Sequence, residues 1–274
     1  MAWDQTYAPN LFSTNGRVDL PSSVLSASGV AGVTLVMSWD CANIAGSGGF
    51  FGNWSTGAAS TDNEILFRSN AQMLQFYIKL EGSSSGPAQI TSAFNASVGD
   101  YFRLAFRYTD SSGEMKVWRK NITDDDAIGT GTFTYAGTGT QWGGTSSVMR
   151  FGEGYNVGSQ PRQNGRTRDA AMWQSRALSD AEVEALINRQ VHPLVLAADN
   201  VWPGTQTTGT QLTDVAGGEH GTLVNCSYGV YQNYSYRSQL PNGPMFVTTG
   251  TGVAPPAGTI ARQHYHHRHH NFAG

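Results

Sequence analysis

Apolar and polar residues alternate along several stretches of the chain, and this alternation predicts β-strands. The stretch GVTLVMSWDC at 32–41 alternates strictly, and its apolar face consists of Val33, Leu35, Met37 and Trp39. Successive side chains of a strand point to opposite faces, so a period of two is typical of a strand with one face on a core. We therefore expect a strand here that is covered on one side.

Two pairs of neighbouring stretches predict antiparallel hairpins. NEILFRSN and MLQFYIKLEG, within 63–82, form the first pair, and DYFRLAFRYTDSSGEMKVWRKN at 100–121 contains the second pair with its polar turn. Short loops that contain Gly commonly join such strands. The inward positions expected for the second hairpin are Phe102, Leu104, Phe106, Tyr108, Met115 and Val117. Further strands are expected at VDLP (18–21), SSVMRFGEG (146–154) and TRDAAMWQS (167–175).

One segment, RALSDAEVEALINR at 176–189, has the pattern of a helix. Ser179 is a favourable N-cap residue, and Glu182 three residues later completes a capping box. Acidic side chains in the first turns suit the positive end of the helix dipole. Leu178 before the cap and Val183 after it form the pair expected of a hydrophobic staple. We therefore expect one short capped helix in an otherwise β chain.

Many short strands, joined by turns rich in Gly, Ser, Thr and Asn, predict an all-β fold. We expect a two-sheet antiparallel sandwich with one short capped helix and an extended C-terminal segment. The expected organisation is an N-terminal arm over 1–15, the sandwich over 16–195 and a C-terminal extension over 196–274. This extension contains the hairpin sequence LTDVAGGEHGTLVN, a Gly/Pro-rich stretch and a His-rich tail.

Composition narrows the classes of function. Only 14% of the residues are charged, against roughly 25% in an average soluble domain. The formal net charge is −3 and no basic stripe is visible, so nucleic acid is not an expected partner. No run reaches the ~18 apolar residues of a membrane helix, and the first residues lack the pattern of a signal peptide. We expect a protein made in the cytoplasm, with no membrane partner.

These motifs, in this order, resemble those of the concanavalin A-like jelly rolls of the laminin G type. RVDLP is similar to the family's opening strand, GVTLVMSWD to a core strand and GDYFRLAFRYTDSSGEMKVW to its central hairpin. AAMWQSRALSDAEVEALI resembles the closing strand and helix, and is the most specific of the four. The resemblance covers residues 16–190. It implies that the two-sheet antiparallel sandwich is a jelly roll. This is a scaffold, and the ligand has to be argued from particular residues.

The resemblance extends to glycosidases of the wider fold, whose pattern is Glu-x-Asp-x-x-Glu on one strand. No stretch here matches that pattern, and Glu64 and Glu114 stand without a second glutamate at its spacing. No Gly-x-Ser-x-Gly elbow occurs either. His220 is expected to be a turn residue, and the acidic run at 124–126 a solvated turn. We therefore expect that the chain is not an enzyme.

Three aromatic residues are candidates for carbohydrate binding. Trp118 and Tyr77 alternate with core positions of their strands and are expected to point away from the core, and Trp54 lies in the predicted loop FGNWSTG. Jelly rolls bind sugars through exposed aromatic side chains and polar loops. The alternative is that these rings pack against an arm, a loop or a partner subunit.

The resemblance also implies a structural alternative, because laminin G-type jelly rolls occur in tailed-phage virion proteins. Low charge, the lack of an export signal and long segments outside the sandwich fit this role. We expect a non-enzymatic structural virion protein, a capsid decoration or head-fibre component that forms a homotrimer and contacts other capsid proteins. The alternative function is a carbohydrate-binding, lectin-like module that attaches to glycans on a surface.

The sequence HYHHRHH near the C-terminus contains two His-x-His pairs. In an extended chain, side chains two residues apart project to the same side. Three chains meeting on a threefold axis would therefore assemble a cluster of imidazoles, which are ligands for transition metals. The metal-ligand candidates are His264, His266, His267 and His269. The alternative is a solvated, weakly cationic tail, and no other cofactor is expected.

Overall fold

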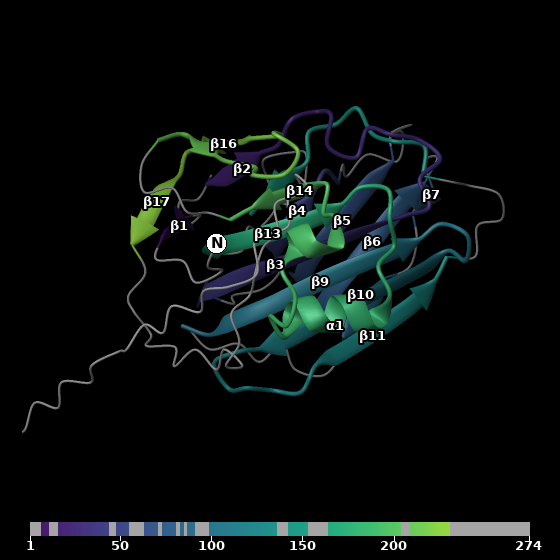
Figure 1. Ribbon diagram of the computed structural model, residues 1–274, viewed down its shortest axis with the longest axis horizontal. Helices are drawn as coiled ribbons and strands as arrows, with labels where there is room; N and C mark the ends of the chain where they lie inside the picture. Colours follow the sequence, from purple (N-terminus) through teal and green to yellow (C-terminus); the bar gives the residue numbers. More distant parts are fainter. Residues whose placement is uncertain are drawn as a thin grey trace, which may run out of the picture. The chain divides into compact units, whose positions relative to one another are not determined.

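The structure is a computed structural model that describes residues 7–10, 16–43, 48–54, 63–70, 73–80, 83–84, 87–90, 99–135, 142–152, 164–203 and 209–230. These residues form two antiparallel sheets, with one α-helix and one 3-10 helix among them (Figure 1). The predicted all-β, two-sheet sandwich is therefore confirmed. No helix in these ranges is long and apolar enough to cross a membrane.

The first sheet contains the hairpin that was predicted within 100–121, and the strand that was predicted at 32–41 lies in the middle of this sheet. In spatial order it runs β11 (Gly129–Thr134), β10 (Glu114–Asn121), β9 (Tyr101–Thr109), β3 (Gly32–Asn43), β13 (Asn164–Trp173), β1 (Tyr7–Asn10) and β17 (Ser227–Val230). A further strand, β14 (Asn200–Trp202), pairs with β13. The hairpin of β9 and β10 confirms the prediction. Part of the expected N-terminal arm, β1, is also a strand of this sheet, between β13 and β17.

The second sheet contains the other predicted hairpin. Its order is β15 (Gln211–Leu212), β16 (Gly221–Val224), β2 (Arg17–Asp19), β12 (Arg150–Phe151), β4 (Gly48–Gly52), β5 (Glu64–Asn70), β6 (Met73–Leu80) and β7 (Ser83–Ser84). A short strand, β8 (Ala88–Ile90), also pairs with β6. The hairpin of β5 and β6 has the predicted antiparallel pairing.

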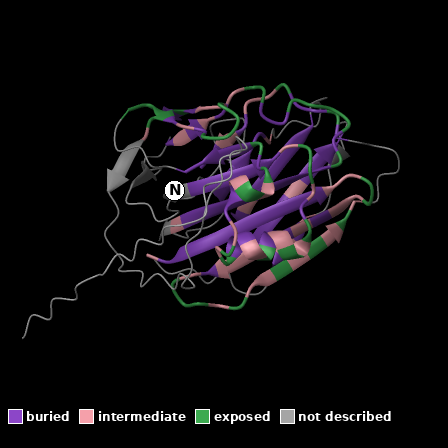
Figure 2. Ribbon diagram, in the orientation of Figure 1, coloured by how far each residue is buried: buried purple, intermediate pink, exposed green. Residues whose placement is uncertain are grey.

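The main core lies between the two sheets and is rich in aromatic rings. Phe76 of the second sheet stacks on Phe106 of the first, with ring centroids 4.2 Å apart. The four apolar residues predicted for one face of β3 all belong to this core. Each large apolar side chain buried here contributes roughly 1.5–3 kcal/mol. Figure 2 shows the consequence: β9 is buried along almost its whole length, whereas the edge strand β11 alternates between exposed and half-buried residues.

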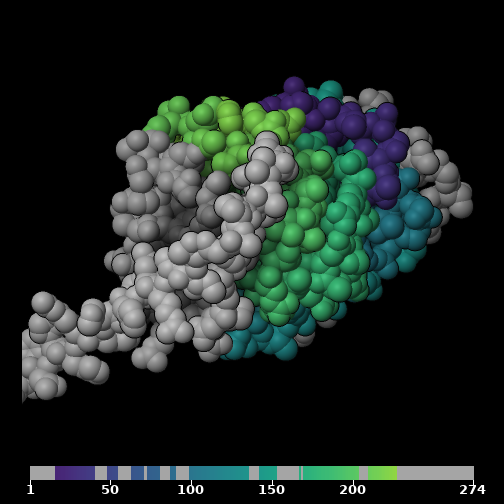
Figure 3. All heavy atoms as spheres, viewed as in Figure 1, coloured from purple at the N-terminus to yellow at the C-terminus, as the bar shows by residue number. Residues whose placement is uncertain are grey.

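A second core lies on the outer face of the first sheet, under α1 (Asp180–Ile187). The predicted capping box is present, because Ser179 accepts a hydrogen bond from the backbone of Glu182 and the Glu182 carboxylate accepts one from the backbone of Ser179. Figure 3 shows the helix and the segment after it covering this face. Val36 of β3 is fully buried there. Both faces of β3 are thus covered, and the expectation of one open face is corrected.

The described strands after residue 195 belong to the sandwich itself. β14 joins the first sheet, and β15 and β16 join the second. Trp202 of β14 packs edge-on against Phe151, with ring centroids 5.4 Å apart, inside the main core. The sandwich therefore continues at least to Val230, beyond the boundary that we expected at residue 195.

Candidate functional site

The outer face of the second sheet carries side chains that alternate with core residues. On β5 and β6, the residues between the buried apolar positions face away from the first sheet, and the same holds for β2, β12 and β8. These outward residues are Arg17, Asp19, Glu64, Leu66, Arg68, Gln75, Tyr77, Lys79, Gln89 and Arg150. Most of them are polar, and Glu64, Leu66, Gln75 and Lys79 are buried.

Two of the three predicted aromatic residues meet on this face. The rings of Trp54 and Tyr77 are 5.9 Å apart between centroids, at an interplanar angle of 59°. Both residues are half-buried, so each retains surface that a ligand can contact. Two half-exposed rings side by side form a surface on which an apolar face of a ligand can stack. We call Trp54 and Tyr77 the aromatic pair.

Asn53, a buried residue, fixes the segment that carries Trp54. Its side-chain oxygen accepts a hydrogen bond of 2.8 Å from the backbone of Ile65 in β5. Its amide donates to the carbonyl of Asn63 at 3.2 Å and to the hydroxyl of Thr145 at 2.9 Å. The indole of Trp54 is therefore held beside β5 and β6 by a satisfied, buried amide, an arrangement that favours a preorganised site.

A hydrogen-bonded network borders the aromatic pair. Arg68 donates through Nε to Oε1 of Gln75 at 3.1 Å and through Nη2 to the hydroxyl of Tyr77 at 3.3 Å. Its guanidinium carbon lies 5.0 Å from the centre of the Tyr77 ring, within the range of a cation–π contact. Gln75 in turn donates to Oε1 of Gln89 at 3.1 Å. Strands β5, β6 and β8 thus each contribute a polar side chain next to the aromatic pair.

Other charges on this face are paired. Lys79 and Glu64 lie opposite each other on β6 and β5, with Nζ and Oε2 3.5 Å apart and both side chains buried. Asp19 accepts from Arg17 at 2.7 Å and from Arg150 at 3.1 Å. Only the Lys79–Glu64 pair is buried, and a buried ion pair adds little net stability because desolvation of the two charges offsets their attraction.

Trp118 does not belong to this site, and its prediction as a sugar-binding residue is corrected. Its side chain points away from the main core as expected, but it is fully buried in the second core beneath α1. The guanidinium of Arg107 and the amine of Lys116 lie 5.2 and 5.1 Å from its ring. The ring has no exposed face for a sugar. The alternative, packing against another part of the chain, is what the structure shows.

His220 and the acidic run at 124–126, which we expected to lie in turns, make contacts within turns. His220 accepts a hydrogen bond through Nδ1 from the backbone of Asp214, inside the turn between β15 and β16. Asp125 and Asp126 form ion pairs with Lys120 and Arg119 in the turn after β10. In the described ranges, no three His, Cys, Asp or Glu side chains are grouped to hold a metal ion. The metal-ligand candidates His264, His266, His267 and His269 lie outside the described residues.

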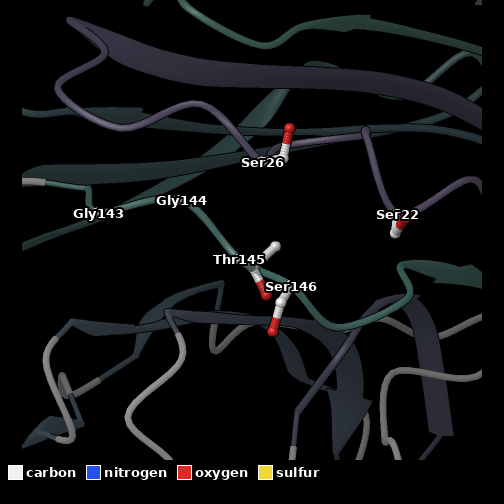
Figure 4. Close-up of a pocket in the computed structure, with 6 residues that line it drawn as sticks. All are labelled: Ser22, Ser26, Gly143, Gly144, Thr145 and Ser146. Carbon is white, nitrogen blue, oxygen red and sulfur yellow. The ribbon is translucent and has the colours of Figure 1, made fainter.

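A shallow depression between two loop segments had no signal in the sequence. It has a volume of about 520 Å³ and is lined by Ser22, Ser26, Gly143, Gly144, Thr145 and Ser146 (Figure 4). Gly144 has φ +81°, and a Cβ there would lie 2.2 Å from the carbonyl oxygen of Ser26, so only glycine fits. The described residues of the lining offer hydroxyl groups, and none of them is aromatic or charged. Loop residues far apart in sequence form it, so no local pattern could reveal it.

Comparisons with known proteins agree on the fold. No protein-family model and no curated protein sequence matches the chain. Among solved structures, a protein from Bacteroides ovatus to which carbohydrate binding has been assigned has a TM-score of 0.51 and 13% identity, over 84% of this chain and 61% of its own. The chain has a concanavalin A-like jelly-roll fold.

Two other similar structures have lower TM-scores. A heptameric pentraxin from Limulus polyphemus is 14% identical over 68% of this chain and 83% of its own, with a TM-score of 0.44. A tailspike protein from the Escherichia coli O157:H7 bacteriophage CAB120 is 15% identical over 69% of this chain and 28% of its own, also at 0.44. This chain therefore spans less than a third of the tailspike protein.

Proposed function

We propose that this chain is a carbohydrate-binding jelly-roll module, and that the glycan binds on the outer face of the second sheet at the aromatic pair. The observation that carries the proposal is the contact of Trp54 with Tyr77 beside the Arg68–Gln75–Gln89 network. A sugar ring has an apolar C–H face and a polar edge. The two aromatic rings can stack on the C–H face, and the neighbouring amides and guanidinium can form hydrogen bonds with the hydroxyl groups.

The similarity to the Bacteroides ovatus protein supports the proposal at the level of the scaffold. One fold serves many functions, so the particular residues carry the argument for binding. The carbohydrate-binding interpretation, which was the alternative in the sequence analysis, thus becomes the main one.

We further propose that the module is not catalytic. Glycosidases place two carboxyl groups roughly 5–9.5 Å apart across the scissile bond. The acidic side chains that the described strands place on this face are Asp19 and Glu64. Their strands, β2 and β5, are separated by β12 and β4, so three inter-strand steps give about 14 Å between them. Glu64 is also buried against Lys79. This geometry favours binding without hydrolysis.

The role in a tailed-phage virion, with a homotrimer and capsid partners, stays a prediction from the sequence. It is compatible with the proposed function, because a decoration or fibre protein can also attach to glycans. The metal clamp at His264, His266, His267 and His269 likewise stays a prediction.

Alanine substitution of the aromatic pair tests the proposed function. The full chain and the variants Trp54→Ala and Tyr77→Ala are applied to a glycan array, and the best binder is then titrated by calorimetry. An aromatic contact contributes about 0.5–1.5 kcal/mol beyond its buried area, so we expect each variant to bind roughly tenfold more weakly or worse.

Tyr135→Ala is the matched control, since Tyr135 is a half-buried tyrosine that follows β11 of the other sheet. It should bind like the unmodified chain, and circular dichroism should show that all variants are folded. The proposed function would be refuted if the unmodified chain bound no glycan. It would also be refuted if the control lost as much glycan affinity as the site variants.

A further inference from the structure

We infer that the open edge of β11 pairs with the same edge of a second copy of this chain, in an antiparallel arrangement with two-fold symmetry. The first sheet then continues from one copy into the other. The pairing does not depend on glycan binding, whereas its consequence for avidity rests on the proposed function. Three features of β11 carry the inference: its open backbone groups, its lack of edge protection and its self-complementary sequence.

β11 lies at one end of the first sheet. It pairs with β10 along all six of its residues, and among the described strands none pairs with its other edge. Thr130, Thr132 and Thr134 are exposed, and they alternate with half-buried residues (Figure 2). The backbone along this edge is therefore open to a further strand.

The hydrogen-bond ladder decides which backbone groups point to the open edge. The N–H of Tyr135 donates to the carbonyl of Gly113 at 2.8 Å, one position beyond the pair of Thr134 with Glu114. In an antiparallel ladder, every second residue directs both its N–H and its C=O to the neighbouring strand, and the residues between them direct both groups away. The residues of β11 that bond to β10 are therefore Gly129, Gly131 and Phe133. The residues that direct both groups to the open edge are Thr130, Thr132 and Thr134.

The second sheet occupies the inner face of β11. A Cβ on Gly131 would lie 1.9 Å from the carbonyl oxygen of Gln89 in β8, and Phe133 packs against the main core. This contact holds β11 in place from one side. The edge and the threonine side chains remain exposed, so a partner finds an edge that is already ordered.

The edge lacks the features that prevent pairing in other sheets. Edge strands are commonly protected by charged side chains, by proline or by a β-bulge. The sequence GTGTFT at 129–134 contains neither a charged residue nor a proline, and its register with β10 is continuous. Threonine also favours the strand conformation. β11 therefore has the properties of a strand that extends a sheet by main-chain hydrogen bonds.

The order of residues in β11 favours a second copy of the same strand as the partner. Antiparallel pairing centred on Thr132 places Thr132 opposite Thr132 of the second copy, and Thr130 opposite Thr134. Each of these pairs can exchange two hydrogen bonds, about six in all. Threonines that face each other across strands form favourable pairs, and no like charges meet. A contact of this kind is satisfied by two copies and closes.

The symmetry of the pairing determines where the two glycan sites lie. The two-fold axis of two antiparallel strands is perpendicular to their sheet, so both second sheets lie on the same side of the joined first sheets. Both copies of the aromatic pair then face the same way. If the proposed function is correct, the dimer is a bivalent module that can bind two glycans of one surface, which increases its avidity.

Sedimentation of the full chain without glycan tests the pairing. We expect a reversible equilibrium of monomer and dimer over roughly 1–300 µM. Thr132→Lys places two like charges opposite each other, and Thr132→Pro removes an outward N–H without a change in the ladder to β10. Each variant should raise the dissociation constant of the dimer at least about tenfold. Circular dichroism and thermal unfolding check that the variants are folded.

Thr222→Lys is the matched control. Thr222 is an exposed threonine of β16, which lies between β15 and β2 and therefore has no open edge. The control adds the same charge to a strand in the interior of the other sheet. It should form the dimer as the unmodified chain does.

Disulfide trapping tests the register. Residues directly opposite in such a pair have Cα atoms about 5.5 Å apart, which a disulfide can bridge, so oxidised Thr132→Cys should be trapped as a covalent dimer. The two copies of residue 130 would be offset by four positions, about 14 Å. Thr130→Cys and the unmodified chain should therefore give little covalent dimer.

Three results would overturn the inference. The first is a monomer at every concentration, and the second is a dimer or trimer that both Thr132→Lys and Thr132→Pro leave unchanged, because another surface would then be responsible. The third is equal trapping of Thr130→Cys and Thr132→Cys, which would exclude the proposed register.

Glycan binding separates this inference from the proposed function. Thr132→Lys should bind a soluble oligosaccharide with unchanged affinity in calorimetry, but should bind a dense glycan surface at least about tenfold more weakly than the unmodified chain does. A dimer that binds no glycan would refute the proposed function and leave the pairing standing. A monomer that binds glycan would do the opposite.

Discussion

Gly131 of β11 occupies a position at which the two sheets touch backbone to backbone. A Cβ there would lie 1.9 Å from the carbonyl oxygen of Gln89 in β8. No real Cβ approaches an atom that closely, so the neighbouring strand would have to move. Gln89 is part of the network beside the aromatic pair. A residue on the first sheet thus sets the position of a binding residue on the second.

We expect Gly131→Ala to displace β8, because backbone cannot yield as a flexible side chain would. Overpacking of this kind costs about 1–3 kcal/mol, and glycan affinity should fall with the shift of Gln89. Urea unfolding and calorimetric titration measure the two effects. Gly129→Ala is the control on the same strand, since its Cβ would meet only ordinary contacts with Ile90 at 3.8 Å. Equal behaviour of the two variants would contradict the proposed close approach.

At the scale of the element, α1 is fixed at its N-terminus by charge and by its cap. Arg107 and Lys116, which flank the ring of Trp118, both form ion pairs with Asp180 in the first turn. Burial opposes ionisation of Asp180, but the hydrogen bonds from Lys116 and Arg107 outweigh it and lower the pKa of Asp180 below its usual value. The helix therefore packs over β9 and β10 in one position and buries Trp118.

Ser179→Ala removes the capping hydroxyl, and we expect a loss of about 1 kcal/mol in the free energy of unfolding. Ser179→Thr keeps a hydroxyl that can accept from the backbone of Glu182, so it should lose only a fraction of that. Urea denaturation of the three proteins gives the comparison. A Thr variant as unstable as the Ala variant would show that the cap is not the cause.

At the scale of the whole molecule, two sets of groups link stability to pH. His192 is buried and accepts a hydrogen bond from the backbone of Leu194 through Nδ1, so the folded state requires neutral imidazole. Burial lowers the pKa of His192 in the folded chain, although the carboxylate of Asp169 opposes this shift. The backbone hydrogen bond from Ser179 is the main cause that lowers the pKa of Glu182.

Stability should therefore fall in two steps on acidification. In the unfolded chain His192 takes up its proton near pH 6.5, so the contribution of neutral His192 to stability is complete above that pH and is lost as the pH falls below it. The contributions of Asp180 and Glu182 are present above about pH 4.5 and are lost below it. Unfolding free energies measured between pH 3 and 8 should show both steps.

Two variants separate the steps. His192→Asn retains an oxygen for the Leu194 N–H but does not titrate, so the step below pH 6.5 should shrink while the acidic step remains. Asp180→Asn should reduce the acidic step and leave the step below pH 6.5 unchanged. If the step below pH 6.5 were unchanged in His192→Asn, a group other than His192 would be responsible for it.

The local patterns of this sequence determined which residues face which way. Alternation identified the inward positions of β3 and β9, and the capping box identified α1, because both depend on residues only two to four positions apart. Tyr77 was correctly expected to point away from the core. Trp54 and Tyr77 were each proposed separately, since each stood out within its own segment.

Only the tertiary structure decided what covers each outward face. Trp118 and Tyr77 have the same pattern, yet α1 buries Trp118 whereas Tyr77 meets Trp54. The arrangement of Arg68, Gln75 and Gln89 across three strands, and the inclusion of β14 to β16 in the sandwich, likewise depend on pairings between distant segments. Alternation reports the side of a strand on which a residue lies. Long-range packing determines whether that side meets a helix, a strand or a ligand.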